Sequence, residues 1–193
     1  MEYELCIREA EISDATALIA FLDCVGQETD FTSLDENGIM MTASEMALFI
    51  EKQAASENQI TLLALLNDEI AGVLNITADQ HLRVQHIGDV FLAVRKKFWN
   101  QGLATILLEE GIEWAKASGV LRRLQLSVQK RNEAAIHLYS KMGFITEGLQ
   151  ERGASLAEGI FLSKLFSIVL VFVAISSSSC SFVAVSIRLL FSP

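Results

Sequence analysis

The segment FWNQGLATILLEEGIEWA, from Phe98 to Ala115, follows the short apolar run VFLAV. The upstream run has the apolar character of a buried strand, and the segment itself carries apolar residues at helical spacing. Between the two lies Gly102, and the small residues Ala104 and Thr105 come shortly after it. The pattern predicts a strand that enters a helix through a turn with little side-chain bulk.

Such a turn suits an anion, because the first N–H groups of a helix lack partners within the helix and carry partial positive charge. Gly102 would let a phosphate approach the backbone, and Asn100 and Gln101 could add side-chain hydrogen bonds. The segment has neither the three-glycine pattern of dinucleotide-binding proteins nor the Gly-Lys-Ser/Thr of a P-loop. On this stretch alone, a glycine that merely makes a turn explains the sequence equally well.

A second segment, LQLSVQKRNEAAIHLYSKMGF, runs from Leu124 to Phe144. It predicts a strand, a short loop and a helix that stops at a glycine. Together the two segments resemble the GNAT superfamily of acetyl-CoA-dependent N-acetyltransferases. The pyrophosphate loop of that family, Q/R-x-x-G-x-G/A, matches residues 99–104, with Trp99 in place of the usual Gln or Arg. The family pattern N-x-x-A-x-x-x-Y-x-x-x-G-F matches at Asn132, Ala135, Tyr139, Gly143 and Phe144.

The order of the predicted elements, β-α-α-β-β-β-α-β-α-β, indicates an α/β protein. The expected architecture is the GNAT fold, with a mixed central β-sheet flanked by α-helices and an atypical apolar C-terminal tail. Apolar periodicity predicts a helix at Asp14–Asp23 with Ser13 as its N-cap, and another at Met40–Ala55 that starts near Thr42 or Ser44. The other predicted helices are Gln101–Ser118 and Asn132–Met142, and the predicted strands are CIREA, ITLLALL, IAGVLNITA, HIGDVFLAV, LRRLQLSV and FITEGLQERG.

Composition narrows the class of protein further. The net charge of −9 argues against nucleic-acid binding, which normally needs a basic face. Cys6, Cys24 and Cys180 have no disulfide or metal-ligand spacing, so we expect reduced thiols and no bound metal. The N-terminal stretch MEYELCIREAEISD is charged and lacks the apolar core of a signal peptide. These features predict a cytoplasmic protein.

The resemblance implies that acetyl-CoA is the cosubstrate. In the GNAT fold the fourth and fifth strands splay apart and the pantetheine arm lies between them, so the backbone of Leu92 and Val94 is expected to pair with it. The pyrophosphate is expected on residues 100–105, and Ala135 is small enough to let the cofactor pass beside Asn132. The expected cofactor-binding residues are Leu92, Ala93, Val94, Asn100, Gln101, Gly102, Leu103, Ala104, Thr105, Asn132, Ala135 and Tyr139.

Acetyl transfer to an amine requires that the amine lose a proton and that the leaving thiolate gain one. Tyr139 is the expected acid, because a phenol carries its proton at neutral pH, although a core aromatic residue is the alternative reading. Asp89, at the head of the fourth strand, is the expected base and would act through water. His86 is its rival, since the reference pKa of histidine is about 6.5.

The resemblance therefore implies an N-acetyltransferase that modifies a primary amine of a small molecule or of a protein N-terminus. The alternative is a CoA-binding sensor or partner protein without turnover. The expected partners are acetyl-CoA and the amine acceptor, and a homodimer is compatible with the sequence. The stretch QETDFTSLDE carries Glu28, Asp30, Asp35 and Glu36, which could form an acidic rim for a cationic amine or simply a charged loop.

The sequence changes character near Lys164. All 24 acidic residues precede this point, and the 23 residues from Leu165 to Ile187 carry no charge. We therefore expect a GNAT acetyltransferase domain at residues 1–164 and an atypical, Ser-rich apolar tail at residues 165–193. Three interpretations of the tail stay open: a frameshifted or divergent end, a loosely packed extra strand, and a membrane anchor. The run is long enough to span a bilayer, but four consecutive serines, Ser176 to Ser179, weaken that reading.

Overall fold

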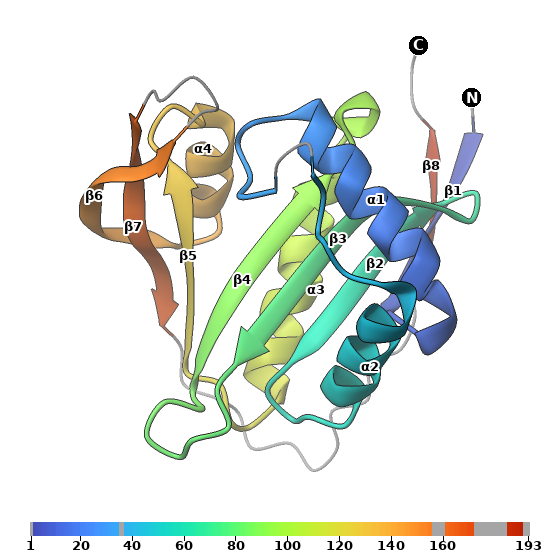
Figure 1. Cartoon of the computed structure of the whole chain (residues 1–193), viewed down its shortest axis with the longest axis horizontal. Helices are drawn as coiled ribbons and strands as arrows, with labels where there is room; N and C mark the ends of the chain where they lie inside the picture. The colour runs from blue at the N-terminus through green and yellow to red at the C-terminus, as the bar shows by residue number, and fades with distance from the viewer. Residues whose placement is uncertain (1, 35–36, 156–160, 172–184, 191–193) are drawn as a thin grey trace.

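The computed structural model describes residues 2–34, 37–155, 161–171 and 185–190 (Figure 1). Within these residues the chain forms one mixed sheet with the strand order β6-β7-β5-β4-β3-β2-β1-β8. Neighbouring strands are antiparallel except β4 and β5, which run parallel. The strands are β1 (Glu2–Glu9), β2 (Ile60–Leu66), β3 (Glu69–Ala78), β4 (Ile87–Val94), β5 (Arg123–Gln129), β6 (Ile145–Ser155), β7 (Phe161–Val171) and β8 (Val185–Leu190).

Helices cover both faces of the sheet. They are α1 (Ala15–Glu28), α2 (Ala43–Ala54), α3 (Leu103–Ala117) and α4 (Glu133–Lys141), with short 3₁₀ helices η1 (Ile12–Asp14) and η2 (Lys96–Phe98). In Figure 1, α1 and α2 lie in front of the sheet and α3 lies behind it. This arrangement confirms the expected mixed sheet flanked by helices.

Alternation along the strands builds a separate hydrophobic core on each face. In β4, Val90, Leu92 and Val94 pack on the α3 side, whereas Phe91 and Ala93 pack on the α1 side. The α3 core is centred on fully buried leucines, and burial of each such side chain contributes about 1.5–3 kcal/mol. The two cores hold β4 rigidly from both sides, which matters because β4 borders the site described below.

Two expected helix starts need comment. Ser13 is not the N-cap of α1, because it lies inside η1 and Asp14 takes the cap position. The Asp14 carboxylate accepts hydrogen bonds from the Glu11 N–H at 2.7 Å and from the Arg8 guanidinium at 2.6 and 2.8 Å, which fixes the turn into α1. At α2 the cap is Thr42 rather than Ser44, and Glu45 completes a capping box with it.

The strand β7 runs across position 164. It lies between β5 and β6 and pairs antiparallel with both, so that Lys164 faces Gln129 on one side and Gln150 on the other. Residues 165–171 therefore belong to the central sheet. Further along, β8 pairs with β1 at the opposite edge. Ser176 to Ser179 and Cys180 lie outside the described residues, and the interpretation of that part of the tail stays a prediction.

None of the helices in the described part of the chain is long and apolar enough to cross a membrane.

Candidate active site

A cavity of about 310 Å³ opens where β4 and β5 part. The two strands are paired only from Ile87 with Arg123 to Asp89 with Gln125, and they separate beyond that point. Both sequence motifs lie on this cavity, although they are far apart in the chain. Of the expected cofactor-binding residues, those that line it are Leu92, Ala93, Val94, Asn100, Gly102, Leu103, Ala104, Thr105, Asn132, Ala135 and Tyr139.

Gln101 is the one member of that set that does not line the cavity. Its side-chain amide donates a hydrogen bond to the Lys97 carbonyl at 3.4 Å, so it faces the preceding turn. Its neighbour Asn100 does line the cavity and has a left-handed backbone with φ of 60°.

The backbone of β4 offers hydrogen-bonding groups to the gap. The Arg95 N–H donates to the Ala71 carbonyl on β3 at 3.0 Å. Because backbone groups alternate in direction along an antiparallel strand, those of Leu92 and Val94 point away from β3, toward the gap. The Val94 carbonyl accepts a hydrogen bond from the Trp99 indole Nε1 at 2.8 Å. Trp99, which departs from the family pattern, thus braces the turn against the end of β4.

The turn before α3 is open to the cavity. Gly102 is the N-cap of α3 with φ of 83°, and a Cβ placed on it would meet nothing within 4 Å. Packing within the protein therefore does not demand a glycine here, although the left-handed backbone favours one. Leu103 follows with a buried side chain, which anchors the helix start in the core. The free N–H groups of the first turn face this open space, as an anion site requires.

On the opposite side, α4 begins at the end of the β5 loop. The Asn132 side-chain oxygen accepts a hydrogen bond from the Ala135 N–H at 3.1 Å and caps the helix. The oxygen of Asn132 is thus engaged, which leaves its amide nitrogen as the group to meet a ligand. Ala135 lines the cavity beside it.

Tyr139 lies one turn further along α4 and also lines the cavity. Its side chain is buried, and its ring packs against Phe144 with 5.6 Å between the ring centroids. Burial raises the pKa of Tyr139 to about 12, because the phenolate would lose its hydration. The phenol therefore keeps its proton throughout the neutral pH range.

Neither expected base lines the cavity. Asp89 lies where β4 and β5 are still paired, and its carboxylate accepts a hydrogen bond from Gln125 Nε2 at 2.9 Å. By strand alternation it shares the α1 face of β4 with Phe91 and Ala93. His86 precedes β4, and its backbone carbonyl accepts hydrogen bonds from Arg122 and Arg123. The geometry supports a role for Asp89 only through an intervening group such as water.

The remaining wall of the cavity lies mostly in the stretch QETDFTSLDE, for which the sequence predicted either an acidic rim for a cationic amine or a charged loop. Its residues are Val25 on α1 and Thr29, Phe31 and Thr32 in the loop that follows. This wall comes from a segment about 70 residues away from Gly102, and no local spacing connects the two. The contact between this loop and the β4–β5 gap depends on tertiary packing. A local sequence pattern therefore does not predict it.

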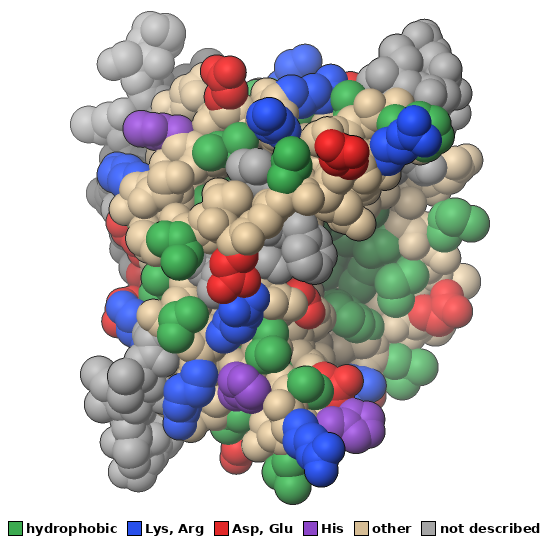
Figure 2. Space-filling model, turned by 90° about the vertical axis from the view of Figure 1, so that its left-hand side faces the viewer, with side chains coloured by type: hydrophobic (Ala, Val, Ile, Leu, Met, Phe, Trp, Pro, Cys, Tyr) green, Lys and Arg blue, Asp and Glu red, His purple; other side chains and the backbone are tan. Residues whose placement is uncertain are grey.

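The acidic residues of this loop are engaged by arginines. The Glu28 carboxylate lies 2.9 Å from Arg95 Nε, and that of Asp30 lies 2.7 Å from an Arg131 nitrogen. These two acids therefore form ion pairs rather than a free acidic rim. Asp35 and Glu36 lie outside the described residues. Figure 2, which views the α4 and β6 side of the molecule, shows basic and acidic side chains interspersed over that face.

Comparison with known proteins identifies the family of the chain. The model of the acetyltransferase (GNAT) family matches residues 31–144, more than half of the chain. The chain therefore belongs to the acetyltransferase (GNAT) family.

Individual relatives agree with this assignment. The crystal structure of a GNAT-family acetyltransferase from Streptococcus pneumoniae is 60% identical, with a TM-score of 0.85 over 87% of this chain and 99% of that one. A phosphinothricin acetyltransferase from Sinorhizobium meliloti in complex with acetyl-CoA is 16% identical, with a TM-score of 0.74 over 91% and 92% of the two chains, and shares the fold. An L-amino acid N-acetyltransferase of Escherichia coli is 32% identical over 93 residues, which are 48% of this chain and 57% of the relative. The chain thus aligns with about half the length of this curated relative.

Proposed function

We propose that the protein transfers an acetyl group from acetyl-CoA to a primary amine. The observation that carries the proposal is the cavity in the β4–β5 gap, because both GNAT motifs line it from opposite sides. The relatives named as N-acetyltransferases support the same reaction.

The residues of the cavity fit acetyl-CoA. Leu92 and Val94 offer backbone groups to a pantetheine arm, which is itself an amide chain and can pair as a strand would. The open turn at Gly102 suits the pyrophosphate, since no side chain fills the space in front of the α3 N-terminus. In the reaction the amine nitrogen bonds to the acetyl carbon, the carbon–sulfur bond breaks, the amine loses a proton and the sulfur gains one.

Tyr139 is the proposed partner of the leaving sulfur. With a pKa of about 12, its hydroxyl is a far weaker acid than an ordinary thiol, whose reference pKa is about 8.5. Complete proton transfer to sulfur is therefore unfavourable by roughly a thousandfold or more. A hydrogen bond from the hydroxyl to the developing thiolate remains favourable. We therefore assign Tyr139 as a hydrogen-bond donor to the leaving group, with water as the final proton source.

The proposed base is Asp89 acting through water. Its carboxylate is exposed and lies on the α1 face of the sheet, near the start of β4 where β4 and β5 are still paired. An amine must lose its proton before attack. A carboxylate that does not contact the amine directly can accept this proton through a chain of water molecules. His86 remains the alternative base.

The acceptor is proposed to be a primary amine of a small molecule or of a protein N-terminus. The curated relatives are named as an L-amino acid N-acetyltransferase, a spermidine N(1)-acetyltransferase and an N-alpha-acetyltransferase. Glu28 and Asp30 are already paired with arginines, so their charges are not available to a cationic substrate. This favours an acceptor with no positive charge beyond that of the reacting amine. Among those classes, amino acids and neutral N-terminal residues fit better than a polyamine.

The test combines binding and turnover on one preparation. Calorimetric titration measures acetyl-CoA binding, and thiol release is then followed with neutral amino acids, short peptides with free N-termini, and spermidine. Release that depends on an amine supports the proposal, and faster release with neutral amines supports the acceptor class. Acetyl-CoA binding without release across the whole panel would instead favour a CoA-binding partner protein. Failure to bind acetyl-CoA would overturn both.

A further inference from the structure

The last residue of α1 and the loop after it contact residues at the ends of the two strands that border the cavity. Figure 1 shows the chain after α1 passing from the end of β4 toward β5 and α4. Beyond Asp89 the two strands have no ladder pairing with each other in the described register, so another connection must set their separation. Glu28 contacts the β4 side and Asp30 contacts the β5 side.

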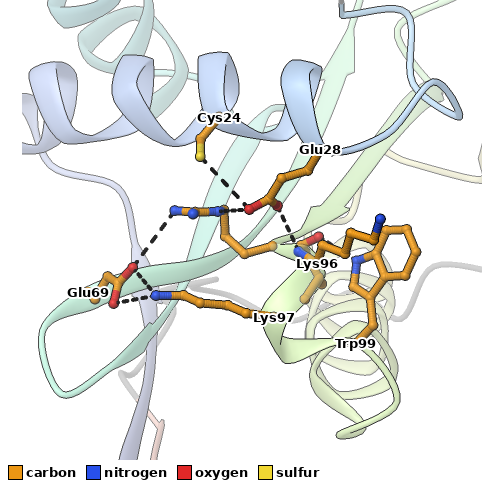
Figure 3. Close-up of polar contacts among 8 residues, drawn as sticks. Cys24, Glu28, Glu69, Lys96, Lys97 and Trp99 are labelled. Atoms are coloured by element: carbon orange, nitrogen blue, oxygen red, sulfur yellow. Dashed lines mark hydrogen bonds and ion pairs between the residues drawn. The ribbon is translucent and has the colours of Figure 1, made fainter.

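The β4 side is held by Glu28, the last residue of α1 (Figure 3). One carboxylate oxygen accepts a hydrogen bond from Arg95 Nε at 2.9 Å, and the other accepts one from the Lys96 backbone N–H at 2.7 Å. Burial alone would raise the pKa of Glu28, but these hydrogen bonds outweigh it and hold the pKa below its usual value. The two contacts fix the start of the segment that leads into the Gly102 turn.

The β5 side is held through Asp30. Its backbone carbonyl accepts a hydrogen bond from Gln129 Nε2, and Gln129, the last residue of β5, is 3% exposed. The carboxylate of Asp30 pairs with Arg131, whose Nε in turn donates to Gln129 Oε1 at 2.8 Å. Arg131 also lies over the ring of Phe31, 5.1 Å from its centroid. The buried side chain of Gln129 thus connects β5 to the loop after α1. Glu28, at the start of the same loop, connects it to the residues that follow β4.

We propose that these contacts act as one strand tie, made by Glu28 and Asp30 with Arg95, Lys96 and Gln129, that fixes the width of the β4–β5 gap for acetyl-CoA. The proposal rests on the proposed function and adds positioning residues to it. Glu28 does not line the cavity, and it acts through the backbone of Lys96 and the turn that follows. Because Phe31 and Thr32 belong to the same loop and line the cavity, the tie also joins this wall of the cavity to the turn at Gly102.

The decisive variant is Glu28→Gln. It has the same size but replaces one acceptor oxygen with a donor amide, so it cannot accept from both Arg95 and Lys96. The tie predicts that the Kd for acetyl-CoA rises roughly tenfold, as expected for the loss of a hydrogen bond that involves a charged group. Simple electrostatics predicts the opposite sign, because removal of a negative charge near the site should favour an anionic ligand. Calorimetry at a temperature where circular dichroism shows the variant folded separates the two.

Two further variants complete the test. Glu113→Gln is the matched control, because Glu113 pairs with Lys116 at 2.7 Å on α3 and neither lines the cavity nor belongs to the tie, and the Kd for acetyl-CoA should stay within about twofold. Gln129→Leu cuts the tie at its other end and should weaken binding about threefold. If the tie acts as a unit, the double variant binds about as weakly as Glu28→Gln alone. Unchanged or tighter binding by Glu28→Gln would overturn the tie. So would a double variant whose Kd rises by the product of the two single effects. Failure of the unmodified protein to bind acetyl-CoA would instead overturn the proposed function.

Discussion

Tyr139 is a buried residue that lines the cavity, and its hydroxyl can be removed with little change in volume. Tyr139→Phe removes one oxygen and little volume. We expect kcat to fall roughly 10- to 100-fold, which is the value of a hydrogen bond to a charged group, while KM for acetyl-CoA changes little. The unmodified enzyme should show no loss of rate that titrates with Tyr139 between pH 6 and 9, because its pKa of about 12 keeps the proton in place until far higher pH.

The neighbouring Phe144 provides the control for that experiment. Phe144→Leu disturbs the same core without touching the hydroxyl, so it should lower Tm and leave kcat per folded molecule nearly unchanged. If Tyr139→Phe behaved like Phe144→Leu, with lower stability and full turnover, Tyr139 would be a packing residue and the leaving sulfur would be served by water alone.

Some single residues could be placed from the sequence and others could not. Asn132, Ala135 and Tyr139 lie on one stretch of helix, so their spacing alone brings them to one cavity. Glu28 and Arg95 are a pair separated by 67 positions, and their ionic contact depends on how α1 crosses the sheet. A charge pattern in one sequence does not reveal such a pairing, so the sequence left open whether this stretch forms an acidic rim or a charged loop.

Among the elements, the N-terminus of α3 offers the sharpest test of the phosphate turn. Gly102→Val places a branched side chain in the open space before the helix and should weaken acetyl-CoA binding more than tenfold. The left-handed backbone at this position also adds strain, since β-branched residues avoid positive φ. Titration calorimetry gives the Kd, and thermal unfolding gives the cost of the strain.

The same helix supplies the matched variant. Gly119 follows the other end of α3 with φ of 73° and equally open surroundings, but it does not line the cavity. Gly119→Val should therefore lose similar stability and keep its affinity for acetyl-CoA. Equal binding by the two variants would mean that the Gly102 turn does not hold the cofactor.

Most helices and strands could be predicted, because each has a local sequence pattern. The apolar run IAGVLNITA, the helical period of residues 101–118 and the glycine that ends α3 are all local features of the sequence. The place of β7 did not follow in the same way. Its apolar run continues into an uncharged stretch, and its insertion between β5 and β6 depends on contacts with strands distant in sequence.

At the scale of the whole molecule, the sheet order predicts how two truncations differ. Ending the chain after Lys164 removes Leu165 to Val171 of β7, which leaves β6 without most of its partner and exposes the edge of β5. We expect Tm to fall by more than about 10 °C and acetyl-CoA binding to be lost. Thermal unfolding and calorimetry measure the two effects.

Ending the chain after Val171 keeps β7 and removes β8, which lies at the far edge of the sheet beside β1. This shorter loss should lower Tm less and leave the Kd for acetyl-CoA within about threefold, since β4 and β5 keep their neighbours. If the two truncated chains bound acetyl-CoA equally well, β7 would not support the cavity.

The indole of Trp99 makes the site optically visible. The chain has two tryptophans, of which Trp114 is 8% exposed in the α3 core and Trp99 is 37% exposed on the cavity wall. Titration with CoA should therefore change the intrinsic fluorescence through Trp99, while Trp114 supplies a constant buried emission. Trp99→Phe should abolish most of the signal change, and a full change in that variant would show that the emission reports a rearrangement around Trp114 instead.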